Sequence, residues 1–412
     1  MIKKILKNTV VYTIGDFLVV AISGILLLPY YTRIMSVDEY AEYGVVNSLI
    51  VLLTFVIQFG IVSTFSRFYF LQGSDERKKI YIGQLLLLQA SLTIVVVIAL
   101  LLMKSFLLME IISSIDNEKL FYCAIIISIC GFLNAMYSAY LRILERPKSF
   151  VLFQLISIIL YVLFIIIFRF FEFDGLEAVV YALMVSTIIM WCVSWYGIPY
   201  SFSFVDIGKT VKETFIFATP VFIAYIMYYC LNKFNILLLQ GIVDKRQLAM
   251  FTFALQLSTI VTVIAGSAGK AVQPALYKLD KIDVFNVSKK LAWYYKLVMS
   301  MLVFIFIFFS ENIILFFAPP DFLESQSLLR ILILSAFIYN IRSVEASLFF
   351  YFKKTRWSLY MTSFSALVVV GSSIIFVPIY GAEASAYAIL LGSFAGFLCN
   401  RFFSRKLRVI GT

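Results

Sequence analysis

The chain has 412 residues, of which 62% are hydrophobic and 14% are charged, and its mean hydropathy is +0.98. Soluble domains carry about 25% charged and about 45–50% apolar residues, so this composition excludes a soluble globular domain, a disordered chain and a nucleic-acid-binding domain. The formal net charge of +11 must therefore be interpreted from the position of each cation relative to a bilayer. The sequence predicts an all-α polytopic membrane protein.

The residue types available for chemistry are restricted. Histidine is absent, which excludes haem, most transition-metal sites and acid–base catalysis by imidazole. The five cysteines lie in apolar runs without paired spacing, so we expect small buried side chains and neither disulfides nor metal ligands. No phosphate-binding glycine loop and no nucleophile elbow occurs. We expect a protein that is not an enzyme and holds no cofactor or metal.

Apolar runs mark the membrane-spanning segments, because a helix needs about 20 apolar residues to cross about 30 Å of hydrocarbon. Their side chains do not alternate with period two, so a membrane β-barrel is not expected. The first run follows three lysines but is too long for a signal peptide and contains Asp16 and Pro29, so we expect it to be retained. The twelve predicted spans are 9–31, 44–66, 82–103, 119–141, 150–171, 176–197, 214–240, 248–269, 293–318, 327–350, 358–378 and 382–402.

The loops between these spans differ in charge. One set of alternating loops carries 24 lysines and arginines and the opposite set carries 7, while Lys233, Lys296 and Arg342 lie within spans. Cytoplasmic loops are enriched in Lys and Arg, so both termini are predicted to be cytoplasmic. The outward loops are short, which argues against a membrane-embedded sugar polymerase or acyltransferase.

The two halves of the chain resemble each other. A shift of 206 residues places each of the first six spans on one of the last six, and it aligns a G-x-E-A-x-x-Y-A pattern at 175–182 with the same pattern at 381–388. An even number of spans per half gives both halves the same orientation, as in the parallel repeats of several secondary transporters. We predict six-helix lobes at 1–197 and 214–412, joined by a cytoplasmic linker at 198–213.

A sequence motif after the first span points to a family. Residues 28–44 contain Pro29, then Thr32-Arg33, then a short polar turn. Ala41 and Glu42 intervene between Glu39-Tyr40 and Tyr43-Gly44, so Glu42-Tyr43-Gly44 is the best match to the Glu-Tyr-Gly end of the pattern. This order resembles the polysaccharide-biosynthesis flippases, the O-antigen and capsule repeat-unit exporters of the multidrug/oligosaccharidyl-lipid/polysaccharide superfamily. Further similar segments are Thr219-Pro220, Asn232-Lys233-Phe234 and residues 273–277.

The resemblance implies a function and partners. It implies a V-shaped transporter whose lobes enclose a cavity, and a cargo of short oligosaccharide on undecaprenyl pyrophosphate. The cargo would move from the cytoplasmic to the outer leaflet of a bacterial inner membrane by alternating access. Twelve spans favour O-antigen or capsule cargo over peptidoglycan precursor. The implied partners are the lipid-linked oligosaccharide, anionic membrane lipid, a coupling ion (H⁺ or Na⁺), polysaccharide polymerase and chain-length proteins, without nucleic acid.

The seventh span carries the candidate cavity residues. An intramembrane cation costs roughly 2.5–3.5 kcal/mol on insertion scales, so it is expected only where it serves a purpose. At helical spacing, one predicted stripe contains Tyr225, Tyr229, Asn232, Lys233, Ile236 and Gln240. Lys233 either faces a cavity that binds pyrophosphate or snorkels to the outer interface.

Other ionisable residues have several interpretations. Asp16 could pair with a neighbouring cation, couple an ion or be solvated, and Arg33 belongs to the family motif. Arg342 and Glu345, spaced i, i+3, are predicted to form an ion pair, or to act in gating or head-group binding. A second set of cations is predicted either to line the inward mouth or to fix topology by binding anionic lipid: Arg67, Arg142 and Lys270.

Two functions remain open from the residues alone. The leading one is the flippase, and the alternative is a cation-coupled drug or metabolite antiporter of the same superfamily. An antiporter of cationic drugs should have more acids than bases within the membrane. The predicted spans of this chain contain three cations, Lys233, Lys296 and Arg342, and two acids, Asp16 and Glu345. This excess of positive charge favours an anionic cargo.

Overall fold

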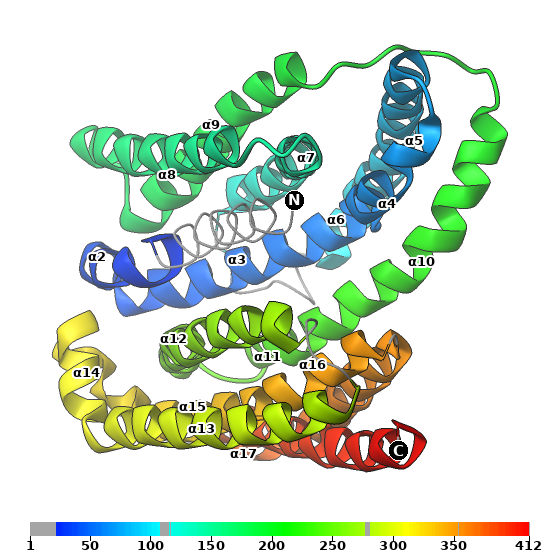
Figure 1. Ribbon diagram of the computed structural model, residues 1–412. Coiled ribbons are helices and arrows are strands. Elements are labelled where there is room, and N and C mark those ends of the chain that lie inside the picture. Colours follow the sequence, from blue (N-terminus) through cyan, green and yellow to red (C-terminus); the bar gives the residue numbers. More distant parts are fainter. Residues whose placement is uncertain (1–21, 108–114, 116, 277–280, 353, 412) are drawn as a thin grey trace. The chain divides into compact units, whose positions relative to one another are not determined.

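The structure is a computed structural model that describes residues 22–107, 115, 117–276, 281–352 and 354–411 (Figure 1). Within these ranges the side chains of residues 22–23, 266–276, 281–283, 350, 355 and 408–411 are not described. The described residues form helices joined by short turns, and no strand occurs among them. The predicted all-α class is confirmed.

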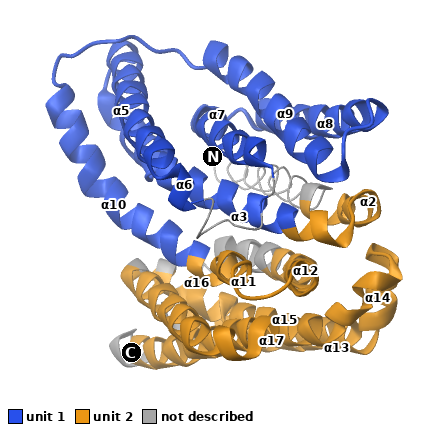
Figure 2. Ribbon diagram, turned by 180° about the vertical axis from the view of Figure 1, so that it is seen from behind, with its two compact units in different colours: residues 1–16, 42–229 blue, residues 17–41, 230–412 orange. Residues whose placement is uncertain are grey.

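The described chain packs as two units, coloured separately in Figure 2. Unit 1 holds residues 42–229, and unit 2 holds residues 22–41 and 230–411. The predicted lobe boundaries at 197 and 214 refer to the sequence repeat rather than to packing, and they stay a prediction.

The described part of unit 1 begins at Glu42, within α3, and ends at Tyr229, within α10, so it contains parts of these two helices and all those between them. They are α3 (Val37–Gln58), α4 (Ile61–Phe68), η2 (Tyr69–Gln72), α5 (Asp75–Leu102), α6 (Lys104–Phe106), α7 (Glu118–Ile143), α8 (Pro147–Phe170), α9 (Gly175–Gly197) and α10 (Ile207–Asn232). Figure 1 shows α7, α8 and α9 side by side. Phe65, Leu85 and Met136 form part of a buried cluster that joins α4, α5 and α7.

The predicted linker is bound to α5 within unit 1. The backbone N–H of Ser201 donates to the carbonyl of Lys79 at 3.0 Å, and the Gln84 amide donates to the carbonyl of Val205 at 2.6 Å. A Cβ on Gly83 would collide with the carbonyl of Ser201, so only glycine permits this close approach. Thr210 donates to Gln84 at 2.6 Å, which fixes the first turn of α10 to α5 as well.

Unit 2 contains the remaining helices. They are η1 (Ile22–Leu26), α2 (Leu28–Ile34), the first turn of α3, α11 (Phe234–Leu239), α12 (Lys245–Leu276), α13 (Lys281–Phe308), α14 (Ser310–Phe317), η4 (Pro320–Ser325), α15 (Gln326–Asn340), α16 (Ser343–Tyr351) and α17 (Thr355–Gly411). Helix α15 packs against α12, α13 and α17. The rings of Tyr40 and Phe322 meet edge to face at 5.4 Å, and Phe253 lies 5.0 Å from Phe322, which gives this unit an aromatic core.

Ten helices of the described chain are long and apolar enough to cross a membrane. They cover the predicted spans from the second onward, and the last of them, Arg356–Leu407, covers both the eleventh and the twelfth. The chain turns there at Gly381, whose φ of 60° favours glycine. Most of the predicted first span, including Asp16, lies outside the described residues. The chain is a multi-pass membrane protein.

Several predicted spans are interrupted. Gly60, with φ 75°, separates α3 from α4; Lys233 separates α10 from α11; and the turn at Ile341 and Arg342 separates α15 from α16. A helix end leaves backbone N–H and C=O groups without intrahelical partners, and in membrane transporters such breaks accompany binding sites. The breaks were not predicted from the apolar runs.

Candidate functional site

The seventh span does not form one uninterrupted helix. Helix α10 ends at Asn232, Lys233 has φ −134° and ψ −22°, and α11 begins at Phe234. The prediction of a single stripe that continues through Ile236 to Gln240 is therefore wrong, because a helical face does not continue across a break. Lys233 is half-buried and Gln240 is buried directly after α11. Their role in binding cargo stays a prediction.

The two tyrosines of this span fasten α10 to its neighbours in unit 1. The hydroxyl of Tyr225 lies 3.0 Å from that of Ser63 on α4, and the hydroxyl of Tyr229 lies 2.9 Å from that of Ser48 on α3. Tyr229 is buried, whereas Tyr225 is half-buried. Of the two, Tyr225 presents more of its side chain to a ligand.

Aromatic rings continue along the same side of α10. Phe55 and Tyr225 stack with ring centroids 5.1 Å apart, and Phe59 and Phe222 stack at 4.6 Å. Tyr228 packs edge-on against Phe55 and is 49% exposed. Aromatic rings combine flat apolar surfaces with, in tyrosine, a hydrogen-bonding group. We call Phe55, Phe59, Arg67, Phe217, Phe222, Tyr225 and Tyr228 the α10 aromatic face.

Arg67 supplies the positive charge of this face. Its guanidinium lies 4.9 Å from the ring centroid of Phe217 and 5.8 Å from that of Phe68, and the residue is exposed. A guanidinium stacked on rings keeps its N–H edge available for bidentate pairing with phosphate. The structure thus places the predicted Arg67 and Tyr225 where α4 contacts α10.

The other two predicted mouth cations are Arg142 and Lys270. Arg142 is exposed near the end of α7 and lies 5.0 Å from the ring centroid of Phe150. Lys270 belongs to α12, but its side chain is not described. Their predicted roles stay predictions.

Unit 2 contains a second group of predicted residues around Glu345. Its carboxylate pairs with Lys296 of α13 at 2.9 Å and accepts a hydrogen bond from Asn400 of α17 at 3.2 Å. The predicted Arg342–Glu345 ion pair is wrong within the described structure. Lys296 and Asn400 occupy the Glu345 carboxylate, and the Arg342 guanidinium packs on the ring of Tyr339 instead.

Arg342 is buried beside this pair, with 6% of its surface exposed. Its Nε donates to the carbonyl of Tyr339 at 3.1 Å, and its guanidinium lies 4.4 Å from the centroid of that ring. Its Nη1 lies against the position where Gly396 has no side chain, close to Ser365. We call Lys296, Arg342, Glu345, Ser365 and Asn400 the Glu345 cluster.

The family-motif residues Thr32 and Arg33 contact the end of α14. Thr32 donates to the carbonyl of Phe317 at 2.7 Å, and Arg33 donates to the carbonyl of Phe316 at 3.4 Å and to that of Pro29 at 2.8 Å. The last carbonyls of a helix lack intrahelical donors, and cationic side chains stabilise that end. Arg33 therefore has a structural contact in unit 2, and its predicted part in binding is untested.

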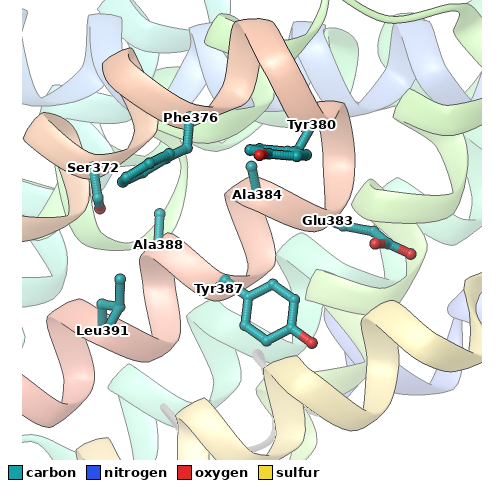
Figure 3. A pocket seen from close by; sticks show the side chains of 8 residues that line it. All are labelled: Ser372, Phe376, Tyr380, Glu383, Ala384, Tyr387, Ala388 and Leu391. Atoms are coloured by element: carbon teal, nitrogen blue, oxygen red, sulfur yellow. The ribbon is translucent and has the colours of Figure 1, made fainter.

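A pocket of unit 2 is lined by residues of α17 from both sides of its turn at Gly381, and Figure 3 shows their side chains. Phe376 and Tyr380 precede the turn, and Glu383 and Tyr387 of the repeat motif follow it. The cavity volume of about 200 Å³ is below the 300–1,000 Å³ of ordinary ligand pockets. In the other copy of the motif, Glu177 instead accepts a hydrogen bond from Asn117 at 2.6 Å. The motif therefore marks a helix start rather than a shared site.

An adjacent pocket of about 530 Å³ is acidic. Its only basic lining residue, Arg246, already forms a bidentate pair with Glu324 at 2.8 and 2.9 Å. Asp244 and Glu383 then leave the pocket negative, which disfavours a pyrophosphate. Compared with this acidic pocket, the α10 aromatic face is better suited to an anionic sugar-bearing ligand.

Sequence reasoning missed several partners in these sites. Ser48 and Ser63 are polar residues within apolar runs, and that contrast could have singled them out. Lys296 and Glu345 are 49 residues apart and Asn400 is a further 55 away, so no local spacing indicates their contact. Phe217 and Phe222 are hidden among 42 phenylalanines.

Comparisons with known proteins identify the family of this chain. A family model described as "Polysaccharide biosynthesis protein" matches residues 5–280. Protein 1 of the Lsg locus of Haemophilus influenzae is 18% identical over 398 residues, which cover 95% of each chain.

Solved structures show the same fold. The lipid II flippase MurJ in an inward closed conformation has a TM-score of 0.73 and 17% identity, and the match covers 98% of this chain and 86% of that one. An inward-facing multidrug resistance MATE family transporter of the MOP superfamily has a TM-score of 0.71 and 16% identity, with 97% and 94% covered. At these identities the likeness establishes the fold alone, and it confirms the predicted transporter architecture.

Proposed function

Because the chain belongs to the polysaccharide biosynthesis protein family, we propose that it translocates lipid-linked oligosaccharide repeat units across the membrane. The proposed cargo is an O-antigen or capsular unit on undecaprenyl pyrophosphate. In this proposal the unit moves from the cytoplasmic to the outer leaflet of a bacterial inner membrane. The transporter fold supports the transport part of the proposal, and the site chemistry supports the cargo.

The α10 aromatic face is the structural feature that best supports the proposed cargo. A repeat unit joins sugar rings, which have apolar faces and hydroxyl edges, to a pyrophosphate. Phe222, Tyr225 and Tyr228 offer flat and hydrogen-bonding surfaces, and Arg67 offers a phosphate-binding edge on the same side of unit 1. Lys233, which belongs to unit 2, is proposed as a counter-charge in its own right.

Alternating access is the proposed mechanism. Two lobes derived from a repeat can pack in two arrangements, and a cargo bound between them is then exposed to one side at a time. In this proposal the lipid tail stays in the bilayer, because only the polar head needs a path through about 30 Å of hydrocarbon. The energy source is an ion gradient, the membrane potential or removal of cargo on the far side.

The test is export in cells that lack their own copy of the gene. Arg67→Ala and Lys233→Ala should each lower surface polysaccharide at matched protein level, because the pyrophosphate loses a counter-charge. The matched control is Arg405→Ala, since Arg405 is an exposed cation at the end of α17. Unchanged polysaccharide in both site variants would remove these residues from the cargo path.

The alternative function is a cation-coupled drug or metabolite antiporter. The MATE similarity supports its fold and not its cargo. Glu345 is the described membrane acid nearest to such a role, but Lys296 neutralises it. Drug efflux coupled to a cation, with no effect on surface polysaccharide, would favour this alternative.

A further inference from the structure

A pocket of about 510 Å³ opens beside the first turns of α13, outside the site proposed for the cargo. Its volume lies within the range of ordinary ligand pockets. Its lining combines basic, aromatic and acidic side chains: Lys289, Lys290, Trp293, Tyr294, Lys296 and Glu345.

The pocket is positively charged. Three ammonium groups line it against one carboxylate, and that carboxylate is already engaged by Lys296 and Asn400. Lys289 and Lys290 are exposed, and neither forms a salt bridge with the described residues. An anion with one phosphate would therefore find two ammonium groups within one turn of the helix.

The same side of α13 continues as an apolar stripe. Its exposed fractions lie between 47% and 68%, and its residues follow helical spacing: Trp293, Leu297, Met301, Phe304 and Phe308. The stripe belongs to the candidate membrane span Val284–Phe308, and its apolar side chains are suited to contact with acyl chains. Lys289 and Lys290 precede Trp293 by about one turn. Along the helix, cations are thus followed by an aromatic ring and then by apolar surface, as at the boundary between lipid head groups and acyl chains.

We propose that this pocket binds the head group of an anionic phospholipid, with the phosphate at Lys289 and Lys290 and an acyl chain along the stripe. From Trp293 to Phe304 the helix rises about 16 Å, close to half of the roughly 30 Å hydrocarbon core, so one leaflet's chain fits it. Free phosphate would use only the lysines. The apolar stripe can bind an acyl chain, so it favours a lipid over free phosphate as the ligand.

The pocket also explains how such a lipid would affect the protein. Its inner wall is the Lys296–Glu345 pair, and Asn400 ties that pair to α17. A lipid held there contacts α13 beside the pair, so it stabilises the folded state by an amount that rises with the logarithm of its concentration above its Kd. Anionic lipid should therefore raise the thermal midpoint more than zwitterionic lipid does.

The direct test uses Trp293 as a reporter. In a chain with Trp191, Trp195 and Trp357 replaced by Phe, nanodiscs carry phosphatidylglycerol or phosphatidylcholine with brominated acyl chains, which quench nearby tryptophan. Phosphatidylglycerol should quench Trp293 at least twofold more strongly. Lys289→Gln with Lys290→Gln should abolish the difference, and Arg405→Gln with Lys406→Gln, both exposed on α17, should retain it. Equal quenching by the two lipids in the parent chain would overturn the proposal.

A second measurement works on the native chain. The thermal midpoint in detergent should rise more with added phosphatidylglycerol than with added phosphatidylcholine. In the Lys289→Gln, Lys290→Gln variant, the two lipids should raise the midpoint equally. An equal rise with inorganic phosphate alone would overturn the assignment to lipid. A difference that persists in the double variant would overturn the assignment to these lysines.

Discussion

At the scale of single residues, the Glu345 cluster shows how a membrane protein accommodates charge. Arg342 keeps its guanidinium on the ring of Tyr339, and Glu345 is held by Lys296 and Asn400. A charge without partners would be costly at this depth. Proximity along the chain suggested that Arg342 pairs with Glu345, but residues distant in the sequence supply the partners of Glu345. The identity of the charged residues was thus predictable, whereas their pairing was not.

Gly396 makes room for Arg342, and this gives a prediction. A Cβ there would collide with the guanidinium and with the Ser365 hydroxyl. Gly396→Ala should destabilise the protein by about 1–3 kcal/mol, as expected for overpacking. Gly371→Ala on the same helix is the control, because nothing lies within 4 Å of its Cβ position. The thermal midpoint should fall for the first variant and stay the same or rise for the second; a fall of equal size in both would contradict the contact.

At the scale of elements, helix starts follow local signals, whereas the break at Lys233 does not. Ser36 and Glu39 form a reciprocal capping box before α3, with bonds of 2.7 and 3.2 Å, and Asp244 accepts from the N–H of Gln247 at 2.7 Å before α12. Such caps are visible in the sequence as Ser or Asp before an apolar run. The break at Lys233 has no comparable signal, because neither proline nor glycine occupies it.

The contact between α2 and α14 provides the prediction at this scale. Thr32→Val keeps the shape of the buried side chain and removes its hydrogen bond to Phe317, which should cost about 1–2 kcal/mol. Thr219→Val is the matched control, since that exposed hydroxyl bonds only the carbonyl of Phe215 in its own helix. Hydrogen exchange should become faster in α14 for Thr32→Val alone. Identical exchange in the two variants would show that the bond does not hold α14.

At the scale of the whole molecule, apolar runs predicted the membrane spans because length and hydropathy alone decide whether a helix can cross a bilayer. The half-length repeat predicted the transporter architecture, which the fold similarity confirms. The packing units could not be predicted, since residues 22–41 pack with the second half of the chain through contacts such as Tyr40 with Gln256 at 3.0 Å. Long-range contacts of this kind leave no trace in a single sequence.

The orientation of the chain is a prediction at this scale. The division of 24 cations against 7 between alternating loops should place both termini in the cytoplasm. A fluorescent protein that matures only in the cytoplasm should therefore be bright when fused to the C-terminus. A fused phosphatase that is active only outside the cytoplasm should be silent there, and the reverse pattern would contradict the assignment.

The central claim is that the chain moves lipid-linked oligosaccharide, and reconstituted transport tests it most directly. Proteoliposomes would carry a fluorescent undecaprenyl-pyrophosphate oligosaccharide, and a membrane-impermeant reductant would bleach only the outer leaflet, with proton, sodium and potential gradients imposed in turn. We predict that the protein moves the inner pool into reach of the reductant under at least one gradient, and that Arg67→Ala slows this severalfold. Bleaching no greater than in protein-free liposomes under every gradient, by protein shown to be folded, would contradict the account.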